Sequence, residues 1–173
     1  MKVTVENYQE LAKRTMASKG SKAADGAHMA LGFTTEIGEM NIGILQEDLV
    51  NIREEHGDTN WYIANACNIY GLNFTSLYRL AVSTPPRLFL LHDLVDLHKR
   101  EFAYGKEMDI NELKEQLITL IQKLLVTSST YGFSYEESLQ LNIDKLAARY
   151  GDKFSEFRAL NRDLNKEQKI LEG

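Results

Sequence analysis

The 173-residue sequence has a single cysteine, only two prolines and no long apolar run. The lone cysteine, Cys67, excludes an internal disulfide and a metal site built from several cysteines, and its apolar neighbours indicate a small core residue. The prolines, Pro85 and Pro86, are adjacent, so long helices are permitted almost everywhere else. No run of about 18 apolar residues could span a bilayer, and the first ten residues lack the apolar stretch of a signal peptide. We therefore expect a cytoplasmic protein with no membrane partner.

The sequence also has fewer basic than acidic residues: it contains 20 lysines and arginines and 25 aspartates and glutamates, for a formal net charge of -5. Phosphate contacts along nucleic acid need a basic face, so nucleic acid is not expected as the main partner. The composition, 43% hydrophobic and 26% charged, is that of an ordinary globular protein, and the length suits one domain. The expected class is all-α, with residues 1–173 forming a single helical bundle.

Apolar residues recur at helical spacing over most of the chain. A turn is expected near residues 46–49, where polar residues interrupt the apolar phase. Ser134 and Glu137 have the spacing of a capping box at the start of a helix. The charged segment 155–171 is expected as a tail with one last, partly frayed helix. Helices are predicted at residues 7–17, 27–45, 50–70, 87–104, 110–130 and 134–150.

Two acidic pairs lie in the stretch from residue 31 to residue 62. Glu36 and Glu39 are three residues apart on one predicted helix, and so are Glu55 and Asp58 on the next, so each pair projects from one helical face. If the chain folds back near residues 46–49, each pair lies roughly 13 to 15 Å from the turn, and the four carboxylates meet at one height. Such a group repels itself unless a hard divalent cation neutralises it, which implies Mg²⁺ or Mn²⁺. The alternative is a pair of ordinary solvated acidic faces.

The second half of the chain looks like a degenerate repeat of the first half. Residues 69–74 align with residues 130–135, and the first acidic pair finds a counterpart in Asp93 and Asp96. The second acidic pair, by contrast, falls on a glutamine and a threonine. This pattern predicts an internally duplicated helical hairpin, a pseudo-dimer, and chance similarity between helical segments is the alternative. The catalytic half would span about 1–84 and the degenerate repeat about 87–154, followed by the charged C-terminal tail.

The acidic pairs stand in a wider motif. His28, Leu31 and Gly32 precede them, and Trp61 and Tyr62 follow directly. This pattern resembles the all-α nucleoside triphosphate pyrophosphohydrolases, the superfamily of the MazG proteins, the dimeric dUTPases and phosphoribosyl-ATP pyrophosphatase. The segment 142–155, NIDKLAARYGDKFS, is similar to the C-terminal signature of the MazG-like group. The chain is longer than a minimal MazG module, and in that respect it is similar to dimeric dUTPase.

The resemblance implies a bundle of the MazG-like type in which the two acidic pairs bind Mg²⁺ and the metal holds the triphosphate of a nucleotide. It also implies that an activated water attacks a phosphorus, with Glu36 or Glu39 as the base, and that a nucleoside monophosphate and pyrophosphate are released. The metal ligands implied are Glu36, Glu39, Glu55 and Asp58.

The same resemblance suggests how the substrate is bound. Lys145 and Arg149 are four residues apart, hence on one helical face, and resemble the cationic residues that hold phosphates in the family. Asn142 is expected to help position the nucleotide, and Trp61 and Asn65 to line the base and sugar pocket. The alternatives are an exposed basic face for Lys145 and Arg149 and a plain core position for Trp61.

The expected function is therefore Mg²⁺-dependent hydrolysis of a nucleoside triphosphate of the (d)NTP class. Specificity of the dUTPase type is an alternative within this chemistry, and a non-catalytic helical interaction module is the alternative outside it. The sequence contains no glycine-rich phosphate loop, no HExxH zinc motif and no nucleophile elbow. The expected assembly is a homodimer.

Overall fold

The computed structural model describes residues 1–151 and 153–172, and every regular element in these residues is an α-helix. The all-α class and the helical bundle expected from the sequence are confirmed. Within the described ranges, no helix combines the length and the apolarity needed to cross a membrane. The helices are α1 (Val5–Lys13), α2 (Lys22–Gln46), α3 (Leu49–Tyr70), α4 (Phe74–Ser83), α5 (Leu91–Tyr104), α6 (Ile110–Tyr131), α7 (Tyr135–Tyr150), α8 (Glu156–Leu160) and α9 (Leu164–Glu172).

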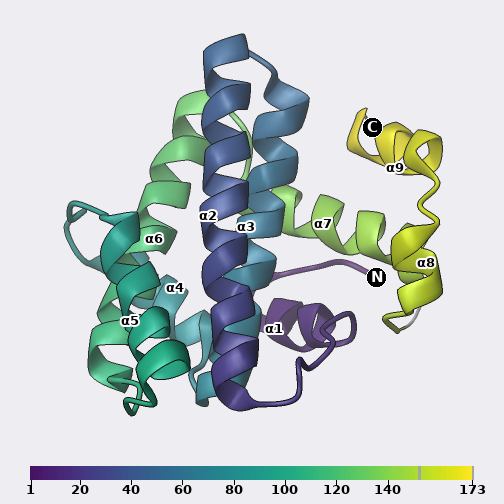
Figure 1. Ribbon diagram of the computed structural model, residues 1–173. Helices are drawn as coiled ribbons and strands as arrows, with labels where there is room; N and C mark the ends of the chain where they lie inside the picture. The colour runs from purple at the N-terminus through teal and green to yellow at the C-terminus, as the bar shows by residue number, and fades with distance from the viewer. Residues whose placement is uncertain (152, 173) are drawn as a thin grey trace.

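Helices α2 and α3 form a central antiparallel hairpin around which the other helices pack (Figure 1). The turn between them lies where the sequence predicts it. Glu47 takes the left-handed conformation with φ of 56°, and the Asp48 side chain accepts a hydrogen bond from the Asn51 backbone N–H. The two helices approach closely at Gly32, because any Cβ there would overlap the Tyr62 ring. Both acidic pairs are therefore held on one hairpin.

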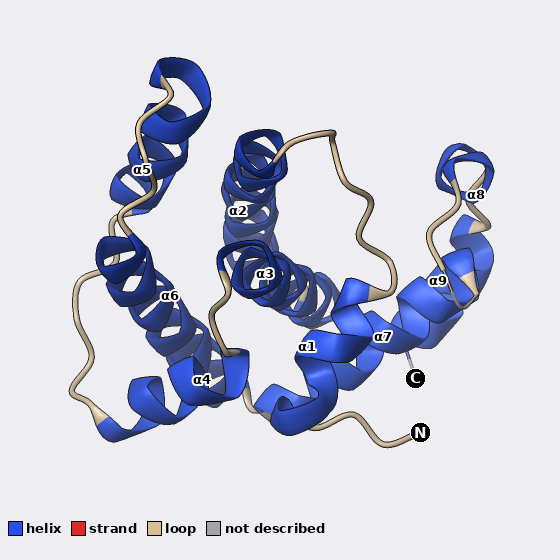
Figure 2. Cartoon of the chain, turned by 90° about the horizontal axis from the view of Figure 1, so that it is seen from below, coloured by secondary structure: helices blue, strands red, loops and turns tan. Residues whose placement is uncertain are grey.

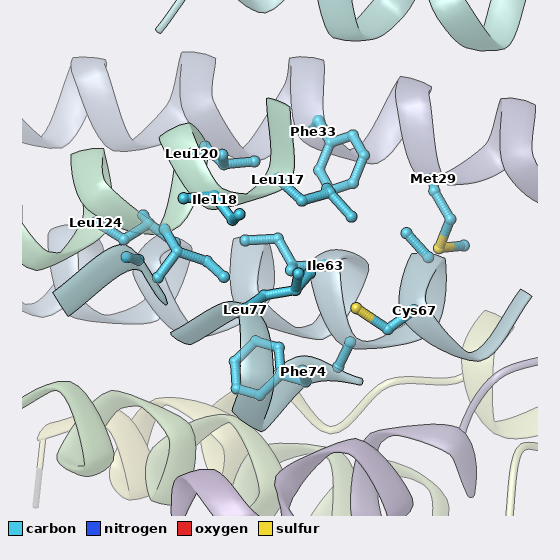
Figure 3. Packing of buried hydrophobic residues seen from close by; sticks show 14 of the residues in the cluster. Met29, Phe33, Ile63, Cys67, Phe74, Leu77, Leu117, Ile118, Leu120 and Leu124 are labelled. Carbon is cyan, nitrogen blue, oxygen red and sulfur yellow. The ribbon is translucent and has the colours of Figure 1, made fainter. Parts of the chain in front are cut away.

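The remaining helices cover two sides of the hairpin (Figure 2). Helices α4, α5 and α6 lie on one side, with α5 against α2 and α4 against α6, while α1, α7, α8 and α9 lie on the other. Phe33, Ile63, Leu77 and Leu117, which come from four different helices, meet in the core on the first side (Figure 3). Cys67 belongs to this core, as expected, and burial raises the pKa of its thiol to about 12. The second side carries the polar cavity described below.

Helices α3 and α6 have matching lengths and ends. Each is 22 residues long and follows an aspartate N-cap, Asp48 or Asp109. Each also ends at a glycine in the left-handed region, Gly71 with φ of 71° and Gly132 with φ of 73°. Helices α2 and α5 differ more, with 25 and 14 residues. The internal duplication stays a prediction, supported by α3 and α6 and not by the helices that precede them.

The acidic pair of the second half contacts residues of its own helix. Asp93 lies 3.2 Å from the imidazole of His92, and Asp96 binds Lys99 at 2.5 Å and Arg100 at 3.1 Å. Exposed cations of α5 thus neutralise Asp96. In the described part of the chain, the grouping of acidic residues suited to a metal ion lies instead on α2 and α3.

Candidate functional site

A cavity of about 580 Å³ opens beside the α2–α3 hairpin and is also lined by α7, by residues between α1 and α2, and by residues that follow α7. The acidic wall of the cavity belongs to the hairpin and its basic wall to segments outside the hairpin, and aromatic rings come from both. The acidic wall consists of Glu36, Glu39, Glu54, Glu55 and Asp58, the basic residues are Lys19, Lys145, Arg149 and Arg162, and the rings are Trp61, Tyr62, Tyr150 and Phe154.

Three of the four predicted metal ligands come together in this cavity. Glu36 and Glu39 of α2 and Glu55 of α3 each offer a carboxylate oxygen, and these oxygens lie within 4.8 Å of one another. Asp58 lines the same cavity, but its two oxygens accept hydrogen bonds from Asn142 at 2.7 Å and from Lys145 at 2.5 Å. The predicted set of four is therefore a cluster of three with Asp58 beside it, because polar groups of α7 engage the fourth carboxylate.

Glu55 is the most buried member of the cluster, with 5% of its surface exposed. Burial, the contact with Glu36 and repulsion from Asp58 together raise the pKa of its carboxyl to about 10. Burial also raises the pKa of Glu36. Within the described residues, the buried Oε2 of Glu55 has no hydrogen-bond partner. An unpartnered carboxylate oxygen beside two further carboxylates suits a hard divalent cation, since such cations take oxygen ligands.

Lys145 is almost completely buried, with 1% of its side chain exposed, and it joins α7 to α3. Its ammonium donates to Glu54 at 2.9 Å and to Asp58 at 2.5 Å. Burial lowers the pKa of Lys145, but the two carboxylates outweigh burial and raise it overall. The structure thus places this predicted phosphate ligand between two acids, which neutralise its charge. Glu54 was missed by sequence reasoning, although its position four residues before Asp58 puts both on one helical face.

Arg149 of α7 contacts the C-terminal segment. Its Nε and Nη2 donate to the two oxygens of Glu167 on α9 at 2.9 and 2.5 Å. Arg162, in the link between α8 and α9, donates to the same two oxygens at 3.4 and 2.6 Å. Arg162 and Glu167 were also missed, because the sequence indicated only a charged tail. Arg149 lines the cavity as expected, but its guanidinium group shares the Glu167 carboxylate with Arg162.

The predicted base-pocket residues separate into two groups. Trp61 lines the cavity, its indole N–H donates to Thr15 Oγ1 at 2.9 Å, and its ring packs edge-on against Tyr62. Asn65 is fully buried and does not line the cavity, since its amide donates to the backbone carbonyl of Trp61 at 3.0 Å. The expected contact of Asn65 with substrate is therefore not supported, because the next turn of α3 faces α1.

Asn142 and His28 also reach the cavity. Asn142 accepts a hydrogen bond from the Tyr8 hydroxyl at 2.8 Å while its amide donates to Asp58. It thus orients an acidic side chain of the site. His28 packs edge-on against Tyr62, and burial, followed by the charge of Lys19, lowers the pKa of its imidazole.

A comparison with protein-family models, with curated proteins and with solved structures finds no significant match to this chain. What can be said of its chemistry rests on the cavity. The acidic wall offers oxygen ligands to a divalent cation, and the basic wall offers guanidinium groups to an anion. The aromatic rings that line the same cavity offer a surface for stacking.

Proposed function

We propose that this chain is a Mg²⁺-dependent pyrophosphohydrolase that converts a nucleoside triphosphate, of the (d)NTP class, to a nucleoside monophosphate and pyrophosphate. One observation carries the proposal: the cluster of Glu36, Glu39 and Glu55, with an unpartnered oxygen on Glu55, shares a cavity with two arginines. The resemblance of the acidic pairs and of residues 142–155 to all-α pyrophosphohydrolases supports the same chemistry.

The residues present fit a divalent cation. Glu36, Glu39 and Glu55 would hold it, with Asp58 adjacent, and Mn²⁺ is expected to replace Mg²⁺ because both take carboxylate oxygens. When bound, Mg²⁺ supplies neutralisation of phosphate oxygens and lowers the pKa of a water molecule.

The remaining roles belong to the chain itself. Arg149 holds phosphate oxygens, and Trp61 and Tyr62 offer ring surfaces to the base. Glu36 or Glu39 accepts the proton of the attacking water. The water oxygen bonds to the α-phosphorus, and the bond from that phosphorus to the bridging oxygen breaks. Pyrophosphate leaves with the bridging oxygen, so one water is consumed for each triphosphate cleaved.

Assembly and location are proposed with this function. We place the protein in the cytoplasm, where its substrates are made and used. A homodimer is supported by exposed apolar residues along α2: Leu31, Ile42 and Leu45 are 68%, 50% and 84% exposed. We propose that these exposed side chains of α2 pack against the second copy of the chain.

Pyrophosphate release from a panel of NTPs and dNTPs tests the proposal. We expect release with MgCl₂ and none in EDTA, and a loss of about 100-fold or more in Glu39→Gln, because a metal ligand or the base is removed. Asp93→Asn is the matched control, since Asp93 aligns with the acidic pair but lies outside the cavity on α5. Its activity should equal that of the wild type. The absence of release from every nucleotide, with the fold intact, would refute the proposal and favour an interaction module.

A further inference from the structure

The C-terminal segment, residues 156–172, comprises α8, the link and α9, and it folds back beside α7 (Figure 1). Its most buried charged group is Glu167, which is 4% exposed although most residues of its short helix are exposed. Leu171, one turn further on, is buried with it. Two buried positions four residues apart give α9 a defined inner face, and this face turns a carboxylate towards the cavity wall.

Both oxygens of Glu167 are shared by two guanidinium groups. Arg149 and Arg162 each present the edge formed by Nε and Nη2, so each makes a two-point contact with the same carboxylate. Two guanidinium groups repel each other at such proximity, and the shared carboxylate is what keeps them side by side. The Nη1 groups take no part in these contacts, and both arginines line the cavity.

The charges of this cluster do not cancel. Arg149 and Arg162 both pair with Glu167, so their cluster has a net charge of +1. Lys145 pairs with two carboxylates, so its cluster has a net charge of -1. The surplus positive charge of this wall therefore lies at the arginine pair. The arginine pair lines the same cavity as the carboxylate cluster, so one cavity contains both an acidic cluster and a surplus of positive charge.

We infer that the C-terminal segment is the anion-binding wall of the site: Arg162 is a second phosphate-binding residue beside Arg149, and Glu167 positions the pair. The ligand class is a linear polyphosphate, free or as the triphosphate of a nucleotide. The inference rests on the proposed function for the nucleotide, and on the geometry of the arginine pair for the polyphosphate.

Binding of inorganic tripolyphosphate tests the inference without turnover. Trp61 is the only tryptophan and lines the cavity, so its fluorescence reports the ligand. Titrations in MgCl₂ should show binding to the wild type and about tenfold weaker binding to Arg162→Gln, because one charged hydrogen-bonding group is lost. Lys169→Gln is the matched control, since it removes one positive charge from an exposed position of the same C-terminal segment. It should bind as the wild type does. No binding to the wild type, or equal binding to Arg162→Gln and Lys169→Gln, would overturn the inference.

Glu167→Gln separates positioning from competition. The substitution adds one unit of positive charge to the wall, so a carboxylate that merely competed with phosphate would give tighter binding when removed. Positioning predicts weaker binding, by about tenfold, despite the added charge. Tighter binding would overturn the role given to Glu167. Mg²⁺ affinity, followed as thermal stabilisation, should stay unchanged in both cavity variants, whereas a general structural defect would lower it too.

The inference and the proposed function fail in different ways. Arg162-dependent tripolyphosphate binding by a protein that cleaves no nucleotide would support the anion wall and refute the hydrolase. Nucleotide cleavage with the same KM and the same tripolyphosphate affinity in Arg162→Gln and the wild type would refute the anion wall and leave the hydrolase.

Discussion

Replacing Glu55 by glutamine should stabilise the metal-free protein while abolishing its response to metal. Glu55 is 5% exposed, and burial followed by its acidic neighbours raises the pKa of its carboxyl from the ordinary value of 4.5 to about 10. At pH 7 the folded, metal-free protein therefore keeps a proton that the unfolded chain has released. Glutamine has nearly the same shape as the protonated acid and needs no proton, so Glu55→Gln removes this free-energy cost of folding.

The magnitude depends on the distance between pH 7 and the ordinary pKa of a glutamate. That distance is about 2.5 pH units, and each unit is worth about 1.4 kcal/mol, so Glu55→Gln should raise the free energy of unfolding by about 3 kcal/mol. The sign of the pH dependence follows from proton uptake. Between pH 4.5 and about 10 the folded state binds one proton more than the unfolded state. The free energy of unfolding of the wild type should fall as pH rises through this range, and the slope should flatten in the variant.

Urea unfolding at several pH values, in EDTA and in MgCl₂, measures both effects. Mg²⁺ at a hundredfold excess over its dissociation constant should stabilise the wild type by about 2.7 kcal/mol and the variant far less, since a neutral amide replaces a charged ligand. Asp93→Asn, on the surface of α5, should change neither the slope nor the effect of Mg²⁺. The reasoning is refuted if Glu55→Gln is no more stable than the wild type in EDTA at pH 7, or if Mg²⁺ stabilises both equally.

Further predictions concern packing, acid stability and assembly. Gly57→Ala should destabilise the protein by about 1 to 3 kcal/mol in urea unfolding, because the added Cβ would lie 2.7 Å from a backbone carbonyl of α7. Gly38→Ala is the control: its Cβ would meet open space, so this substitution should stabilise α2 by up to about 1 kcal/mol. Burial lowers the pKa of His56 to about 4, and its hydrogen bond to a carbonyl of α6 offsets only part of this effect. The imidazole therefore stays neutral in the folded protein between pH 6.5 and 4, whereas in the unfolded chain it takes up a proton below about pH 6.5. The stability advantage of the wild type over His56→Gln should shrink by up to about 3 kcal/mol as pH falls from 6.5 to 4. Light scattering should give twice the chain mass of 19.7 kDa, and Leu45→Glu, at a position 84% exposed, should give the monomer mass; a monomeric wild type would contradict the dimer.

Much of the fold follows from local signals that tertiary packing does not override. Interruption of the apolar phase places the turn at Glu47, and Gly71 ends α3 in the left-handed conformation that glycine adopts readily. Ser134 and Glu137 form the capping box that begins α7. The start of α2 is less well predicted, because Ser21 caps the helix, whereas the apolar pattern predicts a start at residue 27. Helix α1 ends at Lys13, before the predicted end at residue 17.

The residues predicted on both sides, such as Glu55 and Arg149, line the cavity, but the partners of the basic residues were missed. The i, i+3 spacing within one hairpin brings Glu36, Glu39 and Glu55 together, since a hairpin fixes the relative height of its two helices. Contacts between distant segments have no such local signal. Asp58 is hydrogen-bonded to side chains of α7, and this contact depends on how α7 docks on α3. Arg149 and Arg162 share Glu167 because α9 docks on α7. Residue spacing within a single helix reveals neither contact.

The most direct test of the central claim is the position of the attacked phosphorus. A nucleoside triphosphate from the active class would be hydrolysed in ¹⁸O-labelled water with MgCl₂, and the products would be separated and weighed by mass spectrometry. Attack at the α-phosphorus predicts one ¹⁸O atom in the nucleoside monophosphate and unlabelled pyrophosphate, with no product in EDTA and about 100-fold slower product formation in Glu39→Gln. Label in pyrophosphate or in inorganic phosphate would contradict the account, and so would metal-independent cleavage.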